Sequence, residues 1–511
     1  MNTEPPTPVL TSKRPGFLRR LFSRRTLMRV AFVAVCLVTL ATLAVVLKNW
    51  HAARALRAWR TAAEARGERF DWAALIPTMP PPENNFAATP LFKPLFDYEL
   101  MPAKGSASLT ADWVKKDPTG FKRVSDINVI SIRDDAKPEA GKLLDSLNGW
   151  RRGERANLDA WADYYRGNPD YPVPAEPLAS ARTVLAALGK FDAELDELAR
   201  AAARPESVFP VHLEEGLAVK LPHLGPLRNL ERVTVLRALA AGADGNRARA
   251  FEDILLAQRL AEALRTEPWL ISVLVHAAQH SAALQPVWES LAERRLTEGQ
   301  LATLQAELGK ANLIEHLARG IRGERAVVSM FFESGAILSS PGEFQPRTWL
   351  FRYDNELFVN RYCTEDLLPL IHADARQVEV QAGFELNDRL PARLQNPLLV
   401  LARLVIPMTG PVFKNVARAQ AEQNMAIIAC ALERWALAHG GGYPDSPTAL
   451  VPEFLAKLPT DPVNGQPLGY RRTDDGRYAL WSAGARIHPD KDVGTAPPPQ
   501  NYDWVWSYQK L

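Results

Sequence analysis

The chain has 511 residues, of which 47% are hydrophobic, and its formal net charge is only +3. This length can hold two to four domains with sizeable cores, while the small net charge excludes the strongly basic class of nucleic-acid-binding proteins. We therefore expect no nucleic-acid partner, and the 40 prolines predict many interrupted segments rather than one long bundle.

An apolar segment near the N-terminus predicts a membrane anchor. Residues 30–47 carry no charged side chain, and as a helix they would be about 27 Å long, close to the ~30 Å hydrocarbon core of a bilayer. A cleaved signal peptide has a shorter apolar core of about 7–15 residues. Residues 29–48 are thus predicted to be an uncleaved signal anchor and a single membrane span, with cleavage near "HAARA" (51–55) as the open alternative.

The flanks of this span predict its orientation. Lysines and arginines crowd the tail 1–28, with no acidic residue after Glu4. By the positive-inside rule this tail stays in the cytoplasm and the bulk of the chain is extracytoplasmic. We expect a single-pass protein of the bacterial inner membrane with a large periplasmic region.

Residues 49–95 are predicted to form a membrane-proximal helix followed by a proline-rich tether. The helix should end near Gly67, and four prolines lie between Pro77 and Pro82, where they exclude helix. Beyond the tether, "INVISI" (127–132) is typical of a short strand.

The fold class indicated is mainly α, with a mainly helical exported domain at 96–410. Apolar residues recur three and four apart through its helical hairpins, with Ser180 as a helix N-cap. "GADG" (242–245) should separate two antiparallel helices, and "TEGQ" (297–300) is a capping box. The apolar run 396–413 is too short and interrupted for a second span, so we expect a buried core helix or, alternatively, an interfacial contact.

Two histidines in this domain have a spacing that can hold a metal ion. His276 and His280 lie one helical turn apart, on the same face as Trp269. "HAAQH" lacks the glutamate of the metalloprotease motif, however, and the sequence shows no third ligand. Structural histidines are the favoured interpretation.

A second pair of histidines frames an extended connector that is rich in carboxylates. His212 and His223 could perform acid–base chemistry with Glu214 and Glu215, as in a membrane-tethered hydrolase. Without a nucleophile motif, packing and hydrogen bonding are favoured. We therefore expect that the protein is not an enzyme and that it has no catalytic and no cofactor-binding residue.

The three cysteines allow at most one disulfide outside the membrane. Cys36 lies within the span, leaving Cys363 and Cys430. These two could form a bridge in an oxidising compartment, or each could be a small buried hydrophobe.

The last region, 411–511, is predicted to be a small α+β module. Its expected order is a long helix, a short helix at Pro447, a loop and a β-hairpin around "TDDG" (473–476). At the end of the chain, alternate aromatic side chains would cap the core of the module or dock a partner, and core burial is favoured. These aromatics are Tyr502, Trp504, Trp506 and Tyr508.

The module contains sequence motifs that resemble those in the globular part of the major pseudopilins of type II secretion systems. A helix ends in Gly442, Tyr443 and Pro444, and "LVPEFLAKLPTDPVNGQPLGY" and "DGRYALWSAG" follow it. The resemblance covers residues 415–495. It implies an accessory or adaptor role, in which the helical body presents the module to a secretion system or another envelope assembly.

The chain also departs from the pseudopilin pattern. It lacks the family's leader-peptidase site, and the whole helical domain separates its membrane helix from the module, so it cannot enter a filament in the family's usual way. The resemblance further implies calcium binding after the Ser-x-Gly loop, where Asp490 and Asp492 could supply oxygen ligands. Arg486 stands where the family commonly has an aspartate, so a solvated loop is favoured over a calcium-responsive sensor.

Overall fold

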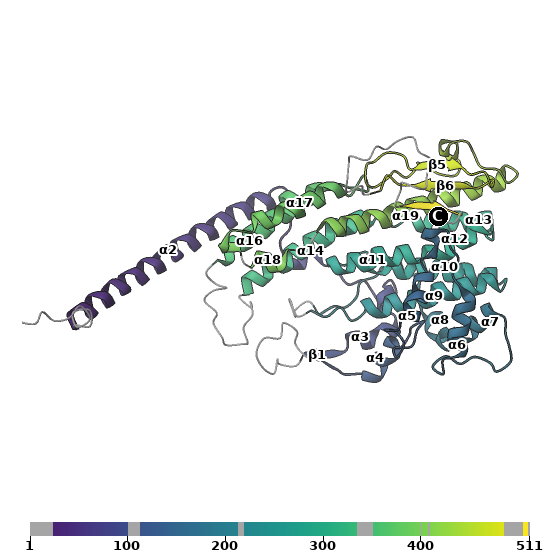
Figure 1. Cartoon of the computed structure of the whole chain (residues 1–511), viewed down its shortest axis with the longest axis horizontal. Coiled ribbons are helices and arrows are strands. Elements are labelled where there is room, and N and C mark those ends of the chain that lie inside the picture. Colours follow the sequence, from purple (N-terminus) through teal and green to yellow (C-terminus); the bar gives the residue numbers. More distant parts are fainter. Residues whose placement is uncertain are drawn as a thin grey trace, which may run out of the picture.

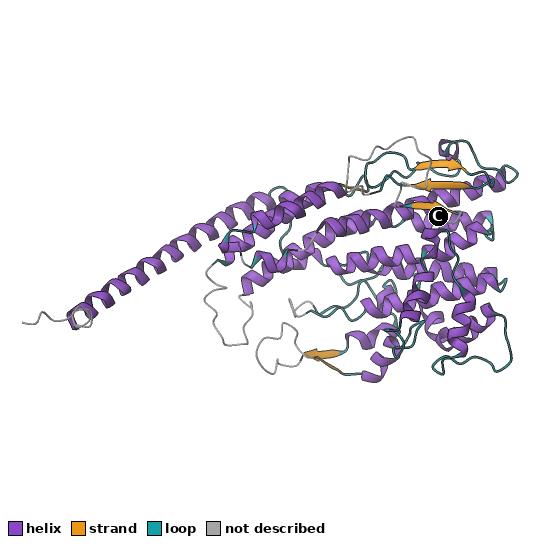
Figure 2. Cartoon of the chain, in the orientation of Figure 1, coloured by secondary structure: helices purple, strands orange, loops and turns teal. Residues whose placement is uncertain are grey.

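The computed structural model describes residues 24–100, 113–212, 219–334, 351–399, 401–406, 409–484 and 504–508. The fold is mainly helical with a small C-terminal sheet, as the sequence predicts (Figure 2). One long helix projects from a body of packed helices, and the sheet lies at the end of the body away from the tip of that helix (Figure 1).

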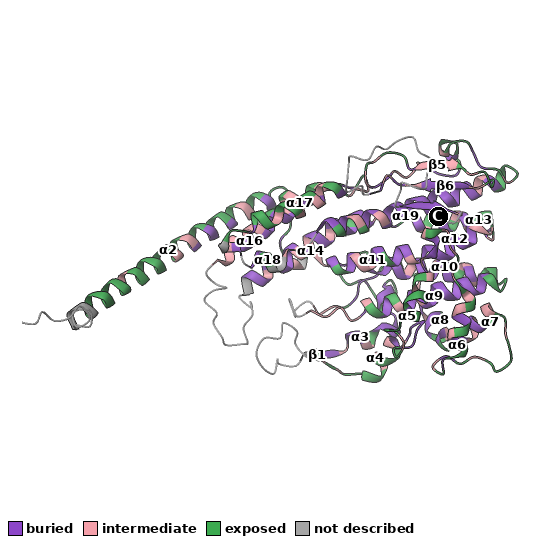
Figure 3. Ribbon diagram, in the orientation of Figure 1, coloured by how far each residue is buried: buried purple, intermediate pink, exposed green. Residues whose placement is uncertain are grey.

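The projecting helix is α2 (Arg24–Glu64), which contains the predicted membrane anchor. Within the described residues it is the one helix long and apolar enough to cross a membrane. Its apolar half is exposed, with Phe32 at 71% and Leu37 at 61% (Figure 3). The helix stops before Gly67, close to the predicted end, and Gly67 has a φ of +96° that favours glycine.

The next part of the chain forms short helices around a first hydrophobic core. Phe86, Phe92 and Leu95 are fully buried there, so the segment expected to be a tether enters the core from Phe86 onward. The helical elements are η1 (Trp72–Leu75), η2 (Phe86–Ala88), η3 (Pro90–Phe92), α3 (Lys93–Phe96), α4 (Pro118–Ser125), α5 (Pro138–Ser146), η4 (Gly149–Arg152), α6 (Leu158–Arg166), α7 (Ser180–Leu188), η5 (Gly189–Phe191) and α8 (Asp192–Ala201). The short strands β1 (Tyr98–Leu100) and β2 (Trp113–Lys115) pair antiparallel.

Two local predictions in this part are wrong. Residues 127–132 form no strand; instead the hydroxyl groups of Tyr165 and Tyr171 donate to the carbonyls of Val129 and Asn128, which fixes this run against α6. Ser180 is the first residue of α7 rather than its N-cap, because its hydroxyl donates to Asp159.

The middle of the body consists of helical hairpins, as predicted. The antiparallel pair separated by "GADG" is confirmed, with Gly245 at a φ of +86°, and so is the capping box of Thr297 and Gln300. The elements are α9 (Leu224–Ala243), α10 (Arg247–Ala261), η7 (Glu262–Leu264), α11 (Leu270–Ala282), α12 (Leu284–Ala292), α13 (Glu298–Gly309) and α14 (Leu313–Ser334).

A third group of elements lies where α2 joins the body (Figure 1). The elements are α16 (Arg352–Arg361), the π-helix η8 (Tyr362–Leu367), η9 (Leu368–Leu370), β3 (Ile371–His372), β4 (Gln377–Val378), α17 (Val380–Arg393), η10 (Pro397–Leu399) and α18 (Ala402–Val405). The prediction of one buried core helix over 396–413 is wrong, because the run is divided among η10, α18 and the start of α19. Pro407, between α18 and α19 in the sequence, lacks the N–H that a continuous helix needs.

Helix α19 (Thr409–Ala438) is the central element of the body. It packs against α11, α13, α14 and α17, and almost its whole surface is buried (Figure 3). A helix buried on all sides needs small and apolar residues all round, which "AIIACAL" (426–432) supplies. Two of the three core clusters therefore share α19, which joins the helical body to the C-terminal sheet.

The C-terminal module has the predicted order of a long helix, a short helix and a hairpin. The short helix is η11 (Pro447–Leu450), and the antiparallel sheet has the order β5 (Gly469–Arg472), β6 (Tyr478–Trp481), β7 (Val505–Ser507). Trp504 and Trp506 are buried, which confirms the prediction of core burial for these two; Tyr502 lies outside the described residues.

The two cysteines outside the span are not bonded to each other. Cys363 and Cys430 are free and buried, in the second and third core clusters respectively. The interpretation as small buried hydrophobes is therefore confirmed, and the alternative of a bridge is wrong.

Candidate functional site

The helical body contains a group of buried polar side chains around α11, which packs against both α9 and α14. We call this group the histidine cluster. Polar groups in such a position destabilise a fold unless each finds a partner. A buried cluster of this kind is therefore the first place to look for chemistry. Its members are His223, Glu262, Glu267, Ser272, His276, His280 and His316.

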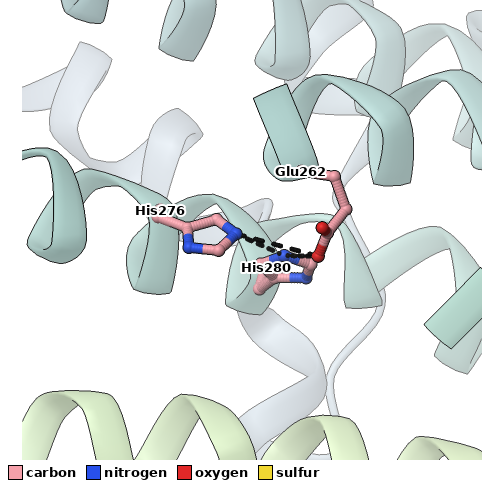
Figure 4. A group of neighbouring side chains, drawn as sticks. All are labelled: Glu262, His276 and His280. Carbon is pink, nitrogen blue, oxygen red and sulfur yellow. Dashed lines mark hydrogen bonds and ion pairs between the residues drawn. The ribbon is translucent and has the colours of Figure 1, made fainter. Parts of the chain in front are cut away.

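Helical periodicity brings most of the cluster together. Ser272, His276 and His280 are spaced by four residues along one face of α11. His316 lies on α14, which packs against α11. Glu262 begins η7, directly after α10, and reaches the α11 histidines from a separate helix (Figure 4).

One half of the cluster centres on the carboxylate of Glu267. Its Oε1 lies 2.6 Å from Nε2 of His223, and its Oε2 accepts a hydrogen bond from the Ser272 hydroxyl at 2.5 Å. A nucleophilic serine would instead donate its proton to the histidine. These three side chains thus form a closed hydrogen-bonded set in which Ser272 is held by the carboxylate.

The other half of the cluster is a chain of imidazoles whose tautomers follow from their partners. Nε2 of His316 lies 2.8 Å from the backbone carbonyl of Glu267, so this nitrogen must carry the proton. Burial lowers the pKa of His316 well below its ordinary value and also lowers that of His276, so both rings are neutral. Nδ1 of His316 is then an acceptor, and it lies 2.7 Å from Nδ1 of His276, which must donate.

This chain leaves Nε2 of His276 with a free lone pair. It points to the place where His280 and Glu262 also converge (Figure 4). Nε2 of His276 lies 3.0 Å from Nε2 of His280 and 3.7 Å from Oε1 of Glu262, and the last two atoms are 2.9 Å apart. Two ring nitrogens thus face one oxygen of the Glu262 carboxylate.

Comparison of the chain with protein-family models, curated proteins and solved structures gives no match.

The structure gives the two histidines of the connector different hydrogen-bond partners, although both contact Phe96. His223 is fully buried against Glu267, whereas the ring of His212 lies 2.9 Å from the carbonyl of Phe96. Glu214 and Glu215 lie outside the described residues, as do the calcium candidates Asp490 and Asp492.

Sequence reasoning found the histidine pair on α11 but not its neighbours. Glu262 is on another helical element, so no short motif connects it to His276 and His280. His316 offered one signal, since it lies between the buried Leu313 and Leu317 on the core-facing side of α14. A histidine in that position is a buried polar group that requires a partner.

Proposed function

We propose that the protein is a single-pass anchor of the bacterial inner membrane, with residues 1–28 in the cytoplasm and a helical body outside it that takes part in an envelope assembly. In this role the body is a structural and interaction element. The proposal assigns it no reaction.

The observation that supports anchoring best is the bare apolar half of α2. None of residues 30–47 is buried, and several of their large side chains are more than half exposed. Exposing these side chains to water is unfavourable, because each CH₂ group that stays unburied loses about 0.8 kcal/mol of hydrophobic stabilisation. A bilayer removes this penalty, since the segment matches the thickness of its hydrocarbon core.

The other half of α2 supports a rigid rather than a loose attachment. The helix continues without a break beyond Lys48 and packs on α16, and Leu56 in this half of the helix is buried. Lys48 forms an ion pair with Asp354, and Nε1 of Trp59 donates to Glu365 at 2.6 Å.

The segment after α2 adds a second attachment. Oε2 of Glu68 lies 2.8 Å from Nη1 of Arg325, a fully buried arginine of α14. Although burial raises the pKa of Glu68, Arg325 and Arg322 hold it below its ordinary value. The body is thus fixed at one distance from the anchor, as a spacer or scaffold requires.

The position of the C-terminal module supports an interaction role. The sheet lies at the end of the body away from the tip of α2, so its surface would be carried furthest from the bilayer (Figure 1). The resemblance of residues 415–495 to pseudopilins suggests which assembly to test first, a secretion system.

Orientation is tested by reporter fusions to the C-terminus of the full chain in a bacterial host. Alkaline phosphatase, which needs export to become active, should be active there, and green fluorescent protein should not fluoresce. The opposite pattern would overturn the proposed topology.

Partner binding is tested by crosslinked pull-down from native membranes. Deleting the module would remove α19 and with it the core, so charge reversal of exposed residues is the better test: Glu453→Lys, Lys457→Glu and Arg472→Glu together. The matched control reverses two exposed charges of α5, Glu139→Lys and Lys142→Glu. Loss of envelope components in the module variant alone supports the adaptor role; equal recovery in all three proteins contradicts it.

A further inference from the structure

We propose that Glu262, His276 and His280 bind one divalent transition-metal ion, best matched by Zn²⁺, which joins η7 to α11 inside the helical body. This site is independent of membrane anchoring and of the module. The proposed function does not require a metal ion in the helical body, so this site goes beyond it.

The spacing of the three ligand atoms is that of a coordination shell. Their separations of 3.0, 2.9 and 3.7 Å define a triangle with a point about 1.9 Å from every corner, close to the roughly 2.0–2.2 Å of Zn–N and Zn–O bonds. An ion slightly above the plane of this triangle would contact all three atoms at normal bond lengths.

Hydrogen bonds among the three ligand atoms leave them poorly satisfied. With the lone pair of His276 and the Glu262 carboxylate both accepting, only a proton on Nε2 of His280 remains to serve them. That nitrogen makes its hydrogen bond with His276, and within the described residues Oε1 of Glu262 is left without a hydrogen-bond partner. A cation at the centre would satisfy both acceptors, and Nε2 of His280 would bind it as well once its proton has moved to Nδ1 of the same ring.

The surroundings orient His276 as metal sites commonly orient a ligand, whereas Nδ1 of His280 has no hydrogen-bond partner among the described residues. A ligating histidine usually donates a hydrogen bond from the N–H of its second ring nitrogen to a fixed acceptor, and His276 does so from Nδ1 to Nδ1 of His316. His316 is in turn held by the backbone of Glu267. The His276 ring therefore presents the correct nitrogen before any metal arrives.

The chemistry of the ligands selects the class of metal. Two imidazoles and one carboxylate suit Zn²⁺ and its neighbours, whereas Ca²⁺ and Mg²⁺ prefer shells of oxygen. A water or the second oxygen of Glu262 would complete a four-coordinate shell. Because all three residues are buried, we infer a structural ion rather than an open catalytic site.

The test measures metal bound to the full chain purified in detergent, stripped with a chelator, reloaded with Zn²⁺ and desalted. Wild type should retain about one ion per chain. Glu262→Gln, which keeps the shape and removes the anionic ligand, should retain less than about a tenth of that. The matched control is His372→Ala, which breaks an exposed histidine–glutamate pair with a 3.0 Å contact to Glu379 and should retain the full amount.

Two results would overturn the proposal: wild type retaining no more Zn²⁺ than E262Q, or H372A losing as much as E262Q. If circular dichroism shows that E262Q does not fold, the proposal is tested instead on the wild-type protein loaded with Co²⁺. Intense visible absorption typical of four-coordinate cobalt, displaced by Zn²⁺, supports the site, and the weak spectrum of hydrated six-coordinate cobalt overturns it.

Discussion

Nδ1 of His276 lies 2.7 Å from Nδ1 of His316, and this contact determines which nitrogen of His276 is free. His316 cannot donate through that atom, because its proton is on Nε2 toward the carbonyl of Glu267. The lone pair of His276 is therefore directed at Glu262 and His280 by a residue that does not touch the proposed ion.

His316→Phe should weaken binding of Zn²⁺ by about 10–100-fold, the usual effect of losing an outer-shell partner of a metal ligand. His316→Asn keeps an oxygen acceptor near the place of Nδ1 and should bind more tightly than the phenylalanine variant. Affinity is measured on the full chain by competition with a chromophoric chelator. Equal affinity of both variants and wild type would show that His316 does not position His276.

Arg325 and Arg322 share the carboxylate of Glu68 but should differ in importance. Arg325 is fully buried 2.8 Å from it, whereas Arg322 is 39% exposed at 3.5 Å. Arg325→Met leaves a largely buried carboxylate without its main partner and should lower the free energy of unfolding by about 3 kcal/mol. Arg322→Met should cost less than about 1 kcal/mol. Denaturant unfolding of the full chain in detergent measures both, and equal losses would contradict the assigned role of Glu68.

Local sequence patterns predicted the elements whose causes are local. The capping box at Thr297, the turn at Gly245 and the apolar half of α2 each depend on neighbouring residues, and each is found where expected. The run 127–132 has the composition of a strand, but no strand lies beside it in the part of the chain that the structure describes. Tyr165 of α6 and Tyr171 of the loop after it donate hydrogen bonds to its carbonyls instead. Pairing is a property of the whole fold, so the sequence of one segment cannot decide it.

For the same reason, the sequence predicted only part of the candidate site. The spacing of His276 and His280 follows from one helix, but Glu262 and His316 come from other elements. Their approach depends on how α10, α11 and α14 pack. Helical periodicity indicates that His316 faces the core, but it does not identify the side chain that His316 contacts.

Gly323 lies where α14 packs tightly against the loop before α11. A Cβ at this position would lie 1.7 Å from the carbonyl oxygen of Pro268, a backbone atom with little freedom to move. Gly323→Ala should therefore destabilise the protein by about 1–3 kcal/mol through overpacking. The control is Gly299→Ala in α13, where the new methyl meets nothing within 4 Å and should add up to about 1 kcal/mol of stability. If both changes stabilise in denaturant unfolding, the two helices do not pack as described.

Cys363 and Cys430 should be free but unreactive thiols. Burial raises the pKa of Cys363 to about 12 and raises that of Cys430 further, so almost no thiolate forms at neutral pH. Both should resist a maleimide reagent in the native protein and react fully in denaturant without reductant. Labelling in denaturant only after reduction would indicate a disulfide and contradict this arrangement.

Glu433 should make the stability of the C-terminal module depend on pH. Burial raises the pKa of this carboxyl above its ordinary value, although the hydroxyl of Tyr443, which donates to it at 2.7 Å, favours the ionised form. A raised pKa in the folded state means that stability is greatest below the unfolded pKa and is lost as the pH rises through the folded one.

Glu433→Gln, which is neutral throughout, should therefore gain stability relative to wild type between pH 4.5 and pH 8, measured by denaturant unfolding. Tyr443→Phe removes a hydrogen bond to the ionised carboxylate, so its loss of stability with rising pH should be steeper than that of wild type. The extra steepness should vanish when Tyr443→Phe is made together with Glu433→Gln, because no charge remains to be stabilised. The same steepness in the double variant would assign the pH dependence to another group.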